Sequence, residues 1–160
     1  MIEMKKKQIS KDKLLLKLLS YCAYQDRCLY EVSQKIHNYD ISPDEEQEIV
    51  DQLIQEKYLD ETRYAKSVAR GKFNYKKWGR NKIRAYLASK RIDITDIHLA
   101  LNEINEQAYL IACIDLVEAK IEKLAPKDLN EFERKQKVIA SLSQKGYEFD
   151  VIERALKELA

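Results

Sequence analysis

The sequence predicts an all-α protein built from three tandem three-helix repeats, stacked into an elongated, curved body. Three observations support this. The 160 residues include only 3 Gly and 2 Pro, too few for the tight turns of a sandwich, a barrel or a βαβ fold. Apolar residues recur with the 3.6-residue period of a helix nearly throughout. Their pattern also repeats along the chain. A hydrophobic content of 45% favours a folded protein over a disordered one.

Nine helical segments follow from this period. They are predicted at residues 11–24, 27–38, 43–57, 60–76, 79–91, 95–104, 106–123, 130–145 and 148–159. The third is the best marked, because Ser42 offers a cap hydroxyl, Pro43 suits the first helical position and Glu45 lies at the third.

Other end signals support the later segments. Asp60, Thr95 and Asn130 each stand where a side-chain oxygen could cap a helix start. Gly146 stands where a helix would end in a left-handed residue. These signals divide the chain after residue 60 into short helices.

An internal repeat groups the helices. Shifting the segment that begins at Arg80 by 55 residues superimposes apolar positions at helical spacing, among them Ile83 on Val138, Leu87 on Leu142, Ile97 on Ile152 and Leu101 on Leu156. The first third of the chain follows the same template at shifts of 51 and 48 residues. These matches reflect shared core packing and therefore indicate architecture, not a binding site.

The predicted division is a basic N-terminal tail at 1–12, repeat 1 at 13–58, a basic central repeat 2 at 59–105 and repeat 3 at 106–160. One such unit is too small to bury its apolar face alone, so neighbours must stack on one another. The resulting elongated surface suits a large partner better than a small substrate.

The N-terminus and the cysteines indicate a cytoplasmic protein. Lys17 interrupts the apolar run after the basic tail, and the run is too short to span a bilayer. We therefore expect no membrane anchor. Cys22, Cys28 and Cys113 form no CxxC pair, so we expect reduced thiols and no structural zinc site.

Charge is distributed unevenly. Residues 62–92 contain eleven Lys and Arg and no Asp or Glu, whereas residues 44–61 carry eight acidic residues and one Lys. The 18 basic and 27 acidic residues outside the basic stretch leave the rest of the chain at −9. Such asymmetry steers a protein toward a polyanion or an acidic protein surface.

No catalytic pattern is visible. The chain has no GxSxG, P-loop, GxGxxG, HExxH or EF-hand sequence, and its two histidines, His37 and His98, lie beside polar residues on predicted helices. We therefore predict that the protein is not an enzyme and has no catalytic residues, cofactor or metal.

The basic stretch is the predicted binding site. In the helix after Asp60, basic residues at spacings of three, four and seven form a face opposite the inward apolar stripe. The predicted partner-binding residues are Arg63, Lys66, Arg70, Lys76, Lys77, Arg80 and Arg84. They could contact phosphates or an acidic protein surface. Trp78 and Gly79 are predicted to anchor the connecting loop, with direct stacking on a partner as the alternative for Trp78.

The central stretch resembles the signature of the RecX family, the bacterial regulators of RecA recombinase. The matching elements are Leu59-Asp60, Tyr64-Ala65, Arg70, Gly79 and Ile83-Arg84-Ala85-Tyr86-Leu87, with Arg27 in the first repeat. The resemblance covers roughly residues 13–159. Tyr64 replaces the commoner Phe, Cys28 stands where Ser is frequent, and Arg80 follows Gly79 where a small residue or Pro is usual.

The resemblance implies a three-repeat all-α protein that lies in the groove of the RecA filament on single-stranded DNA. We expect this protein to be a monomer. It would restrain RecA ATPase, strand exchange and stimulated repressor self-cleavage, and so act in recombination, DNA repair and the SOS response. A weak direct contact with DNA stays open. From the residues alone, a sequence-nonspecific nucleic-acid-binding module and a helical scaffold with a merely solvated basic face are alternatives.

Overall fold

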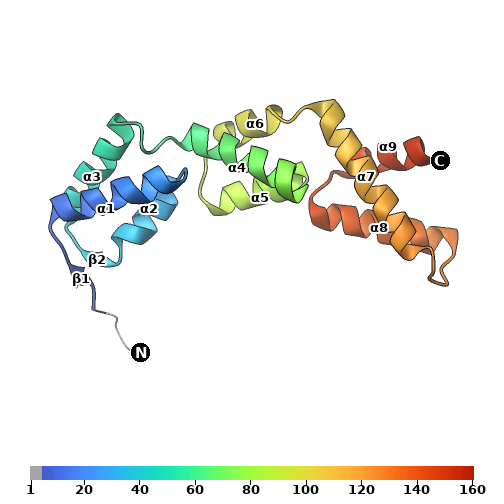
Figure 1. Cartoon of the computed structure of the whole chain (residues 1–160), viewed down its shortest axis with the longest axis horizontal. Coiled ribbons are helices and arrows are strands. Elements are labelled where there is room, and N and C mark those ends of the chain that lie inside the picture. The colour runs from blue at the N-terminus through green and yellow to red at the C-terminus, as the bar shows by residue number, and fades with distance from the viewer. Residues whose placement is uncertain (1–4) are drawn as a thin grey trace.

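The structure is a computed structural model that describes residues 5–160, and it is an elongated, arched row of helices (Figure 1). Nine helices lie in this described range. They are α1 (Lys11–Tyr24), α2 (Leu29–Ile36), α3 (Pro43–Gln55), α4 (Glu61–Lys76), α5 (Arg80–Ser89), α6 (Ile94–Asn102), α7 (Glu106–Leu124), α8 (Glu131–Lys145) and α9 (Phe149–Leu159). The all-α prediction is confirmed, and each helix lies within about two residues of its predicted range.

Most predicted helix ends are confirmed by their hydrogen bonds. The side chains of Ser42, Asp60 and Asn130 each accept a bond from the backbone N–H three residues on. Gly146 ends α8 with φ 104°. The predicted Thr95 cap is wrong, because α6 begins at Ile94 and the Asp93 carboxylate accepts from the N–H of Thr95. Aspartate is at least as good a cap as threonine, so the earlier residue starts the helix.

Replacing Ser42 with alanine is expected to lower the free energy of unfolding by about 1 kcal/mol, because the N–H of Glu45 loses its 3.2 Å acceptor. Urea denaturation measures this loss. The control is Ser20→Ala, which changes an exposed serine inside α1 and should be neutral or slightly stabilising. Equal midpoints for Ser42→Ala and wild type would contradict the capping role.

Part of the predicted tail is tied down. Strand β1 (Lys7–Gln8) pairs in parallel with β2 (Tyr39–Asp40), which directly follows α2. The N–H of Lys7 donates to the carbonyl of Asn38 at 3.0 Å, and Gln8 Nε2 donates to Asp40 at 2.8 Å. Within the predicted basic tail, these residues therefore form a short strand pair. Residues 1–4 of that tail lie outside the described residues.

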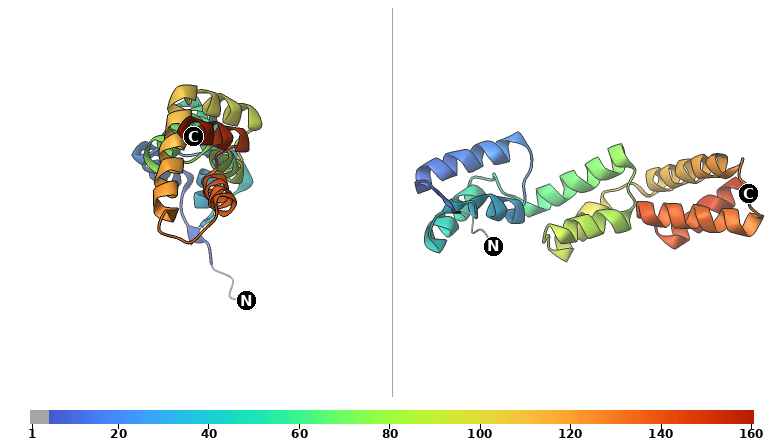
Figure 2. Two further views of the ribbon diagram at one scale, coloured as in Figure 1. Left: turned by 90° about the vertical axis from the view of Figure 1, so that its right-hand side faces the viewer. Right: turned by 90° about the horizontal axis from the view of Figure 1, so that it is seen from below.

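The helices group in threes, α1–α3, α4–α6 and α7–α9, and these groups follow one another along the long axis (Figures 1 and 2). The three-helix repeats and the elongated body are as predicted. Within the second group α4 packs on α5 and α6, and within the third α7 packs on α8 and α9. The residue boundaries at 12, 58 and 105 stay a prediction.

Two hydrophobic cores run through this row. The first belongs to α1–α3 and includes Leu14, Leu18, Val32, Ile49 and Leu53. The second is continuous from α4 to α9, so the second and third groups share one core. One residue of the first group, Cys28, is fully buried in the second core. The first group therefore docks on the second through a small apolar contact, while the second and third are fused.

Within the described residues, no helix combines the length and apolar character that crossing a bilayer requires.

Candidate partner-binding surface

The eleven basic residues of the 62–92 stretch fall into two sets. Arg63, Lys66 and Arg80 form ion pairs with carboxylates of other helices or connectors. Among the described residues, the other eight have no carboxylate within ion-pair distance: Arg70, Lys72, Lys76, Lys77, Lys82, Arg84, Lys90 and Arg91. The positive field of the stretch comes from this second set.

Arg63 is used inside the protein. Its Nε donates to Asp26 at 2.9 Å, in the connector between α1 and α2. Its Nη atoms donate to the carbonyls of Lys57 (2.9 Å) and Tyr58 (3.3 Å), just after α3. The guanidinium thus joins the first helix group to α4 and uses three of its five N–H donors inside the protein. Its contact with a partner stays a prediction.

The connector between α1 and α2 completes this junction. Arg27 lies 3.8 Å from the ring centre of Tyr21, and its Nε donates to the Tyr21 carbonyl. Next to it, Cys28 is buried against α4–α6, and the N–H of Leu29 donates to Glu61 at 3.4 Å. The arginine that the sequence resemblance singles out therefore stabilises the turn that docks on repeat 2.

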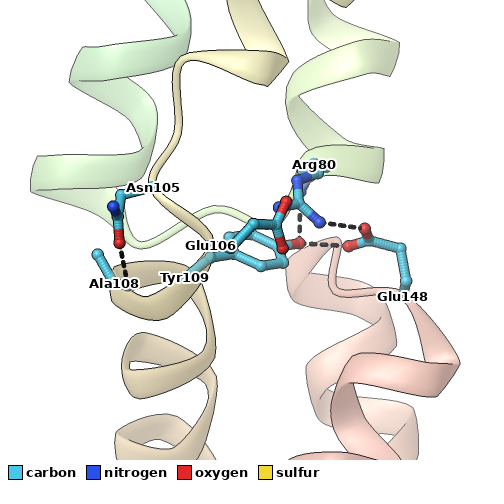
Figure 3. A network of polar contacts seen from close by, with 6 residues as sticks. All are labelled: Arg80, Asn105, Glu106, Ala108, Tyr109 and Glu148. Carbon is cyan, nitrogen blue, oxygen red and sulfur yellow. Dashed lines mark hydrogen bonds and ion pairs between the residues drawn. The ribbon is translucent and has the colours of Figure 1, made fainter.

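Arg80 holds the second junction (Figure 3). Its guanidinium donates to Glu148 at 2.9 Å and to Glu106 at 2.5 Å, and lies 3.9 Å from the ring centre of Tyr109. Only 15% of its side chain is exposed. The backbone N–H of Arg80 also donates to the Tyr109 hydroxyl, which in turn donates to Glu148. Asn105, beside this network, caps α7 through the N–H of Ala108.

The network keeps Glu148 ionised. Burial disfavours its charged form, but hydrogen bonds from Tyr109 and Arg80 outweigh that effect and lower the pKa of Glu148. Burial raises the pKa of Tyr109, so its hydroxyl stays protonated as the donor. Arg80 was predicted to bind a partner, whereas the geometry makes it the polar clamp between the second and third groups.

Gly79 and Gly146 bring the two backbones together beside this clamp. The N–H of Gly79 donates to the backbone carbonyl of Lys145, and the N–H of Asn81 donates to that of Gly146, both at 2.9 Å. A Cβ on Gly79 would lie 2.3 Å from the carbonyl carbon of Gly146. The Tyr147 hydroxyl donates to the carbonyl of Lys77 across the same contact. Gly79 therefore anchors the loop by close approach.

Four lysines without carboxylate partners surround two aromatic rings; we call Lys72, Lys76, Lys82 and Lys90 the lysine cluster. The ammoniums of Lys82, Lys72 and Lys76 lie 4.5, 4.7 and 5.8 Å from the Trp78 ring centre. Those of Lys72 and Lys90 lie 4.7 and 5.6 Å from the Tyr86 ring centre. Cation–π attraction of about 0.5–1 kcal/mol per exposed contact helps to hold them.

Trp78 is half-buried beneath these ammoniums. Its ring meets Tyr86 edge to face at 5.9 Å and packs against the core shared by the second and third groups. This packing favours the predicted anchor role over direct stacking on a partner. Three ammoniums also occupy the neighbourhood of the ring, so it offers a partner little free face.

The cluster is electrostatically strained. Burial lowers the pKa of Lys72, and the positive charges of Lys76, Lys82 and Lys90 lower it further. No described carboxylate forms an ion pair with any of the four. A bound anion would relieve this repulsion, which makes the cluster the best candidate for an anion site.

Of the four cluster residues, only Lys76 was among the predicted partner-binding residues. Lys72 lies nine positions beyond Arg63, which at ~100° per residue puts it half a turn away from the predicted face. Lys72 lies on the same side of α4 as the buried residue Ala65. Helical periodicity would therefore assign the position of Lys72 to the core. The only available signal was the i, i+4 spacing of Lys72 with Lys76 and of Tyr86 with Lys90.

The remaining predicted residues are not brought into one site. Arg70 is exposed and, with Lys66, lines a hollow between α4, α6 and the start of α7. Lys66 is paired there with Glu103 at 3.1 Å. Lys77 is exposed in a left-handed turn (φ 56°), and Arg84 donates to the Asn81 side chain. The predicted face is thus a dispersed positive surface.

The thiols offer no alternative site. Cys22, Cys28 and Cys113 are buried and unpaired by disulfides. Burial raises the pKa of Cys28 to about 11 and that of Cys113 to about 12, so both stay protonated and poorly nucleophilic. Residues 5–160 contain no group of three or more His, Cys, Asp or Glu side chains that could hold a metal ion.

Comparison with known proteins decides the family. The model of the second three-helix domain of RecX matches residues 60–101, and that of the third matches residues 107–156. This chain belongs to the RecX family. The RecX domains matched are the two that share one core and meet at the Arg80 clamp.

RecX proteins of known sequence and structure agree with this assignment. Regulatory protein RecX of Lactobacillus gasseri is 28% identical over 141 residues, 88% of this chain and 51% of its own length. That of Bacillus mycoides is 29% identical over 147 residues, 92% of this chain and 54% of its own. The chain therefore spans about half the length of these relatives. The crystal structure of RecX from Lactobacillus salivarius superposes with a TM-score of 0.86 at 27% identity, covering 93% of this chain and 96% of that one.

Proposed function

We propose that this protein is a non-enzymatic regulator of RecA recombinase. It binds in the groove of the RecA filament on single-stranded DNA and restrains RecA ATPase, strand exchange and stimulated repressor self-cleavage. It acts as a cytoplasmic monomer without a cofactor, in recombination, DNA repair and the SOS response. Its RecX relatives carry the name regulatory protein, and the family resemblance supplies RecA as the target.

One observation supports the proposal most directly. An elongated body displays eight basic residues without carboxylate partners in a stretch of 31 residues, while the rest of the chain is acidic on balance. A filament of RecA on DNA is a long, grooved polyanion. A curved row of helices with its positive charge in the middle is complementary to such a groove in shape and in charge.

A second function is supported by the lysine cluster. Lysines arranged around aromatic rings suit a sequence-nonspecific nucleic-acid-binding module, which would need no RecA. The two functions differ in partner dependence. A regulator should bind the filament tightly and free DNA weakly, whereas a plain DNA-binding module should bind free DNA as well as it binds the filament.

Titration into a RecA ATPase assay on single-stranded DNA separates the two. We expect saturable inhibition at protein concentrations well below those at which the protein alone binds the same DNA, the second measured in parallel by fluorescence anisotropy. Inhibition that follows DNA occupancy would instead indicate competition for DNA. Unchanged ATPase activity at saturating protein would contradict the regulatory proposal.

A further inference from the structure

A groove beside α4 joins the lysine cluster to an exposed aromatic ring. Lys72, Lys76 and Tyr86 line it, and so does Tyr75, which is 89% exposed. Tyr75 stands directly before Lys76 on α4 and forms none of the described aromatic pairs. An aromatic ring this exposed contributes little to folding, so its face is free for a ligand.

At the other end of the groove, the charges of the lining carboxylates are already compensated by arginines. Asp26 and Glu31 line it there, but Arg63 pairs with Asp26 at 2.9 Å and Arg27 lies 3.9 Å from Glu31. The uncompensated charge therefore lies only at the α4–α5 end. An anionic ligand would be held at the lysine cluster and kept off the junction with α1–α3.

The chemistry of the cluster favours a nucleic-acid strand over an acidic protein surface. Its cations are all lysines, which bind anions as point charges and suit phosphates of any sequence, so the feature that separates the two partners is the aromatic ring beside them. The exposed ring of Tyr75 adds a stacking surface, which a row of carboxylates would not use. Point charges beside a free aromatic face are typical of sites for single-stranded nucleic acid.

We propose that the lysine cluster and Tyr75 form a binding site for single-stranded DNA, with ammoniums on consecutive phosphates and the Tyr75 ring stacked on a base. The inference deepens the proposed function, on which it rests for the choice of DNA as the strand. It separates Arg63 and Arg80, which join the helix groups, from the lysine cluster, which holds the strand.

Neutralising the cluster tests the phosphate contacts. The triple variant Lys72→Gln, Lys76→Gln and Lys82→Gln is compared with wild type for binding of a fluorescein-labelled oligothymidylate at low salt. We expect affinity to fall at least about tenfold and the slope of log affinity against log salt to shrink by about 2, since three phosphate contacts are lost. The matched control is Lys120→Gln, Lys123→Gln and Lys127→Gln, which removes the same charge from the third helix group and should change affinity less than about threefold. Equal losses in both triples, or none in the first, would overturn the site.

Folding does not obscure this test. Removing these crowded ammoniums relieves their mutual repulsion but also removes their cation–π contacts with Trp78 and Tyr86. The two effects oppose each other, so the melting temperature of the cluster variant should stay close to that of wild type. Tyr75 gives an independent variant pair: Tyr75→Ala should weaken oligothymidylate binding about fivefold or more, while Tyr75→Phe, which keeps the ring, should bind as wild type does. Unchanged affinity of Tyr75→Ala would remove the stacking role.

The wild-type protein carries its own reporter. Trp78 is the single tryptophan, and three cluster ammoniums lie within 5.8 Å of its ring centre. Phosphates that draw these ammoniums away should change Trp78 emission saturably, with the same midpoint as anisotropy. Binding seen by anisotropy with constant Trp78 emission would place the DNA elsewhere and contradict the proposal.

The RecA ATPase assay separates this inference from the proposed function. If wild type leaves RecA unaffected but the cluster variant loses oligothymidylate binding, the DNA site stands and the regulatory proposal fails. If wild type inhibits RecA and the cluster variant binds oligothymidylate normally, the DNA site fails. A cluster variant that loses only filament binding would show that these lysines contact protein, which also overturns the site.

Discussion

Gly79→Ala is expected to lower the free energy of unfolding by about 3 kcal/mol or more. The new Cβ would lie 2.3–2.4 Å from the backbone of Gly146 and Tyr147, where no side chain can move aside. The two backbones must separate, which overpacks the contact and strains the hydrogen bonds of Gly79 and Asn81 across it. Thermal unfolding followed by circular dichroism should show a melting temperature lower by about 6–12 °C.

Gly71→Ala is the matched control for that experiment. Gly71 lies inside α4, and a Cβ placed on it meets nothing within 4 Å. Alanine there should raise stability by about 0.5–1 kcal/mol, because glycine loses more conformational freedom in a helix. If both glycine variants melt alike, the close approach of Gly79 to Gly146 does not hold the second and third groups together.

Neutralising Arg70, Lys77 and Arg84 to glutamine is expected to weaken filament binding at least about a hundredfold. These are predicted partner-binding residues that lack carboxylate partners and lie outside the lysine cluster. Each lost contact with an anionic group should cost on the order of 1 kcal/mol. Inhibition of RecA ATPase should fall in parallel, and raising the salt concentration should reproduce part of the loss.

Stability and charge controls accompany this variant. Charges without an internal partner contribute little to folding, so its melting temperature should stay close to that of wild type. The Lys120, Lys123 and Lys127 triple removes the same charge from a region where acidic residues are interspersed and should inhibit nearly as wild type does. Equal loss in both triples would assign the effect to net charge, and no loss in either would leave the basic stretch a solvated surface.

The helices could be predicted from the sequence because their signals are local. The 3.6-residue period, the caps at Ser42, Asp60 and Asn130, and the left-handed Gly146 involve residues within one or two turns of each other. The Thr95 cap failed within the same range, because Asp93 offered an equivalent oxygen two residues earlier. The repeat in the apolar pattern likewise predicted the tandem groups, since each helix face must find a neighbour.

The strand pair and the shared core were not predictable in this way. Strand β1 has two residues, too few for an alternating pattern, and pairs with residues 32 positions away. That α4–α9 form one core while α1–α3 keep their own depends on which faces meet between groups. Hydrophobic periodicity shows which face of a helix is buried, but not which other helix packs against that face.

The sequence by itself determined the helical class, the repeat and the concentration of positive charge in residues 62–92. Only the tertiary structure decided what each charge does. It placed Asp26 beside Arg63 and Glu148 beside Arg80, 37 and 68 residues apart in the chain. Within residues 5–160 it left the lysine cluster without a carboxylate at ion-pair distance. The physical reason is that a charge is defined by its own residue, whereas its neutralisation requires an opposite charge within about 4 Å. For Arg63 and Arg80 the opposite charges belong to other helix groups, so the packing of the groups fixes that these two arginines join them and that the lysine cluster keeps its charge.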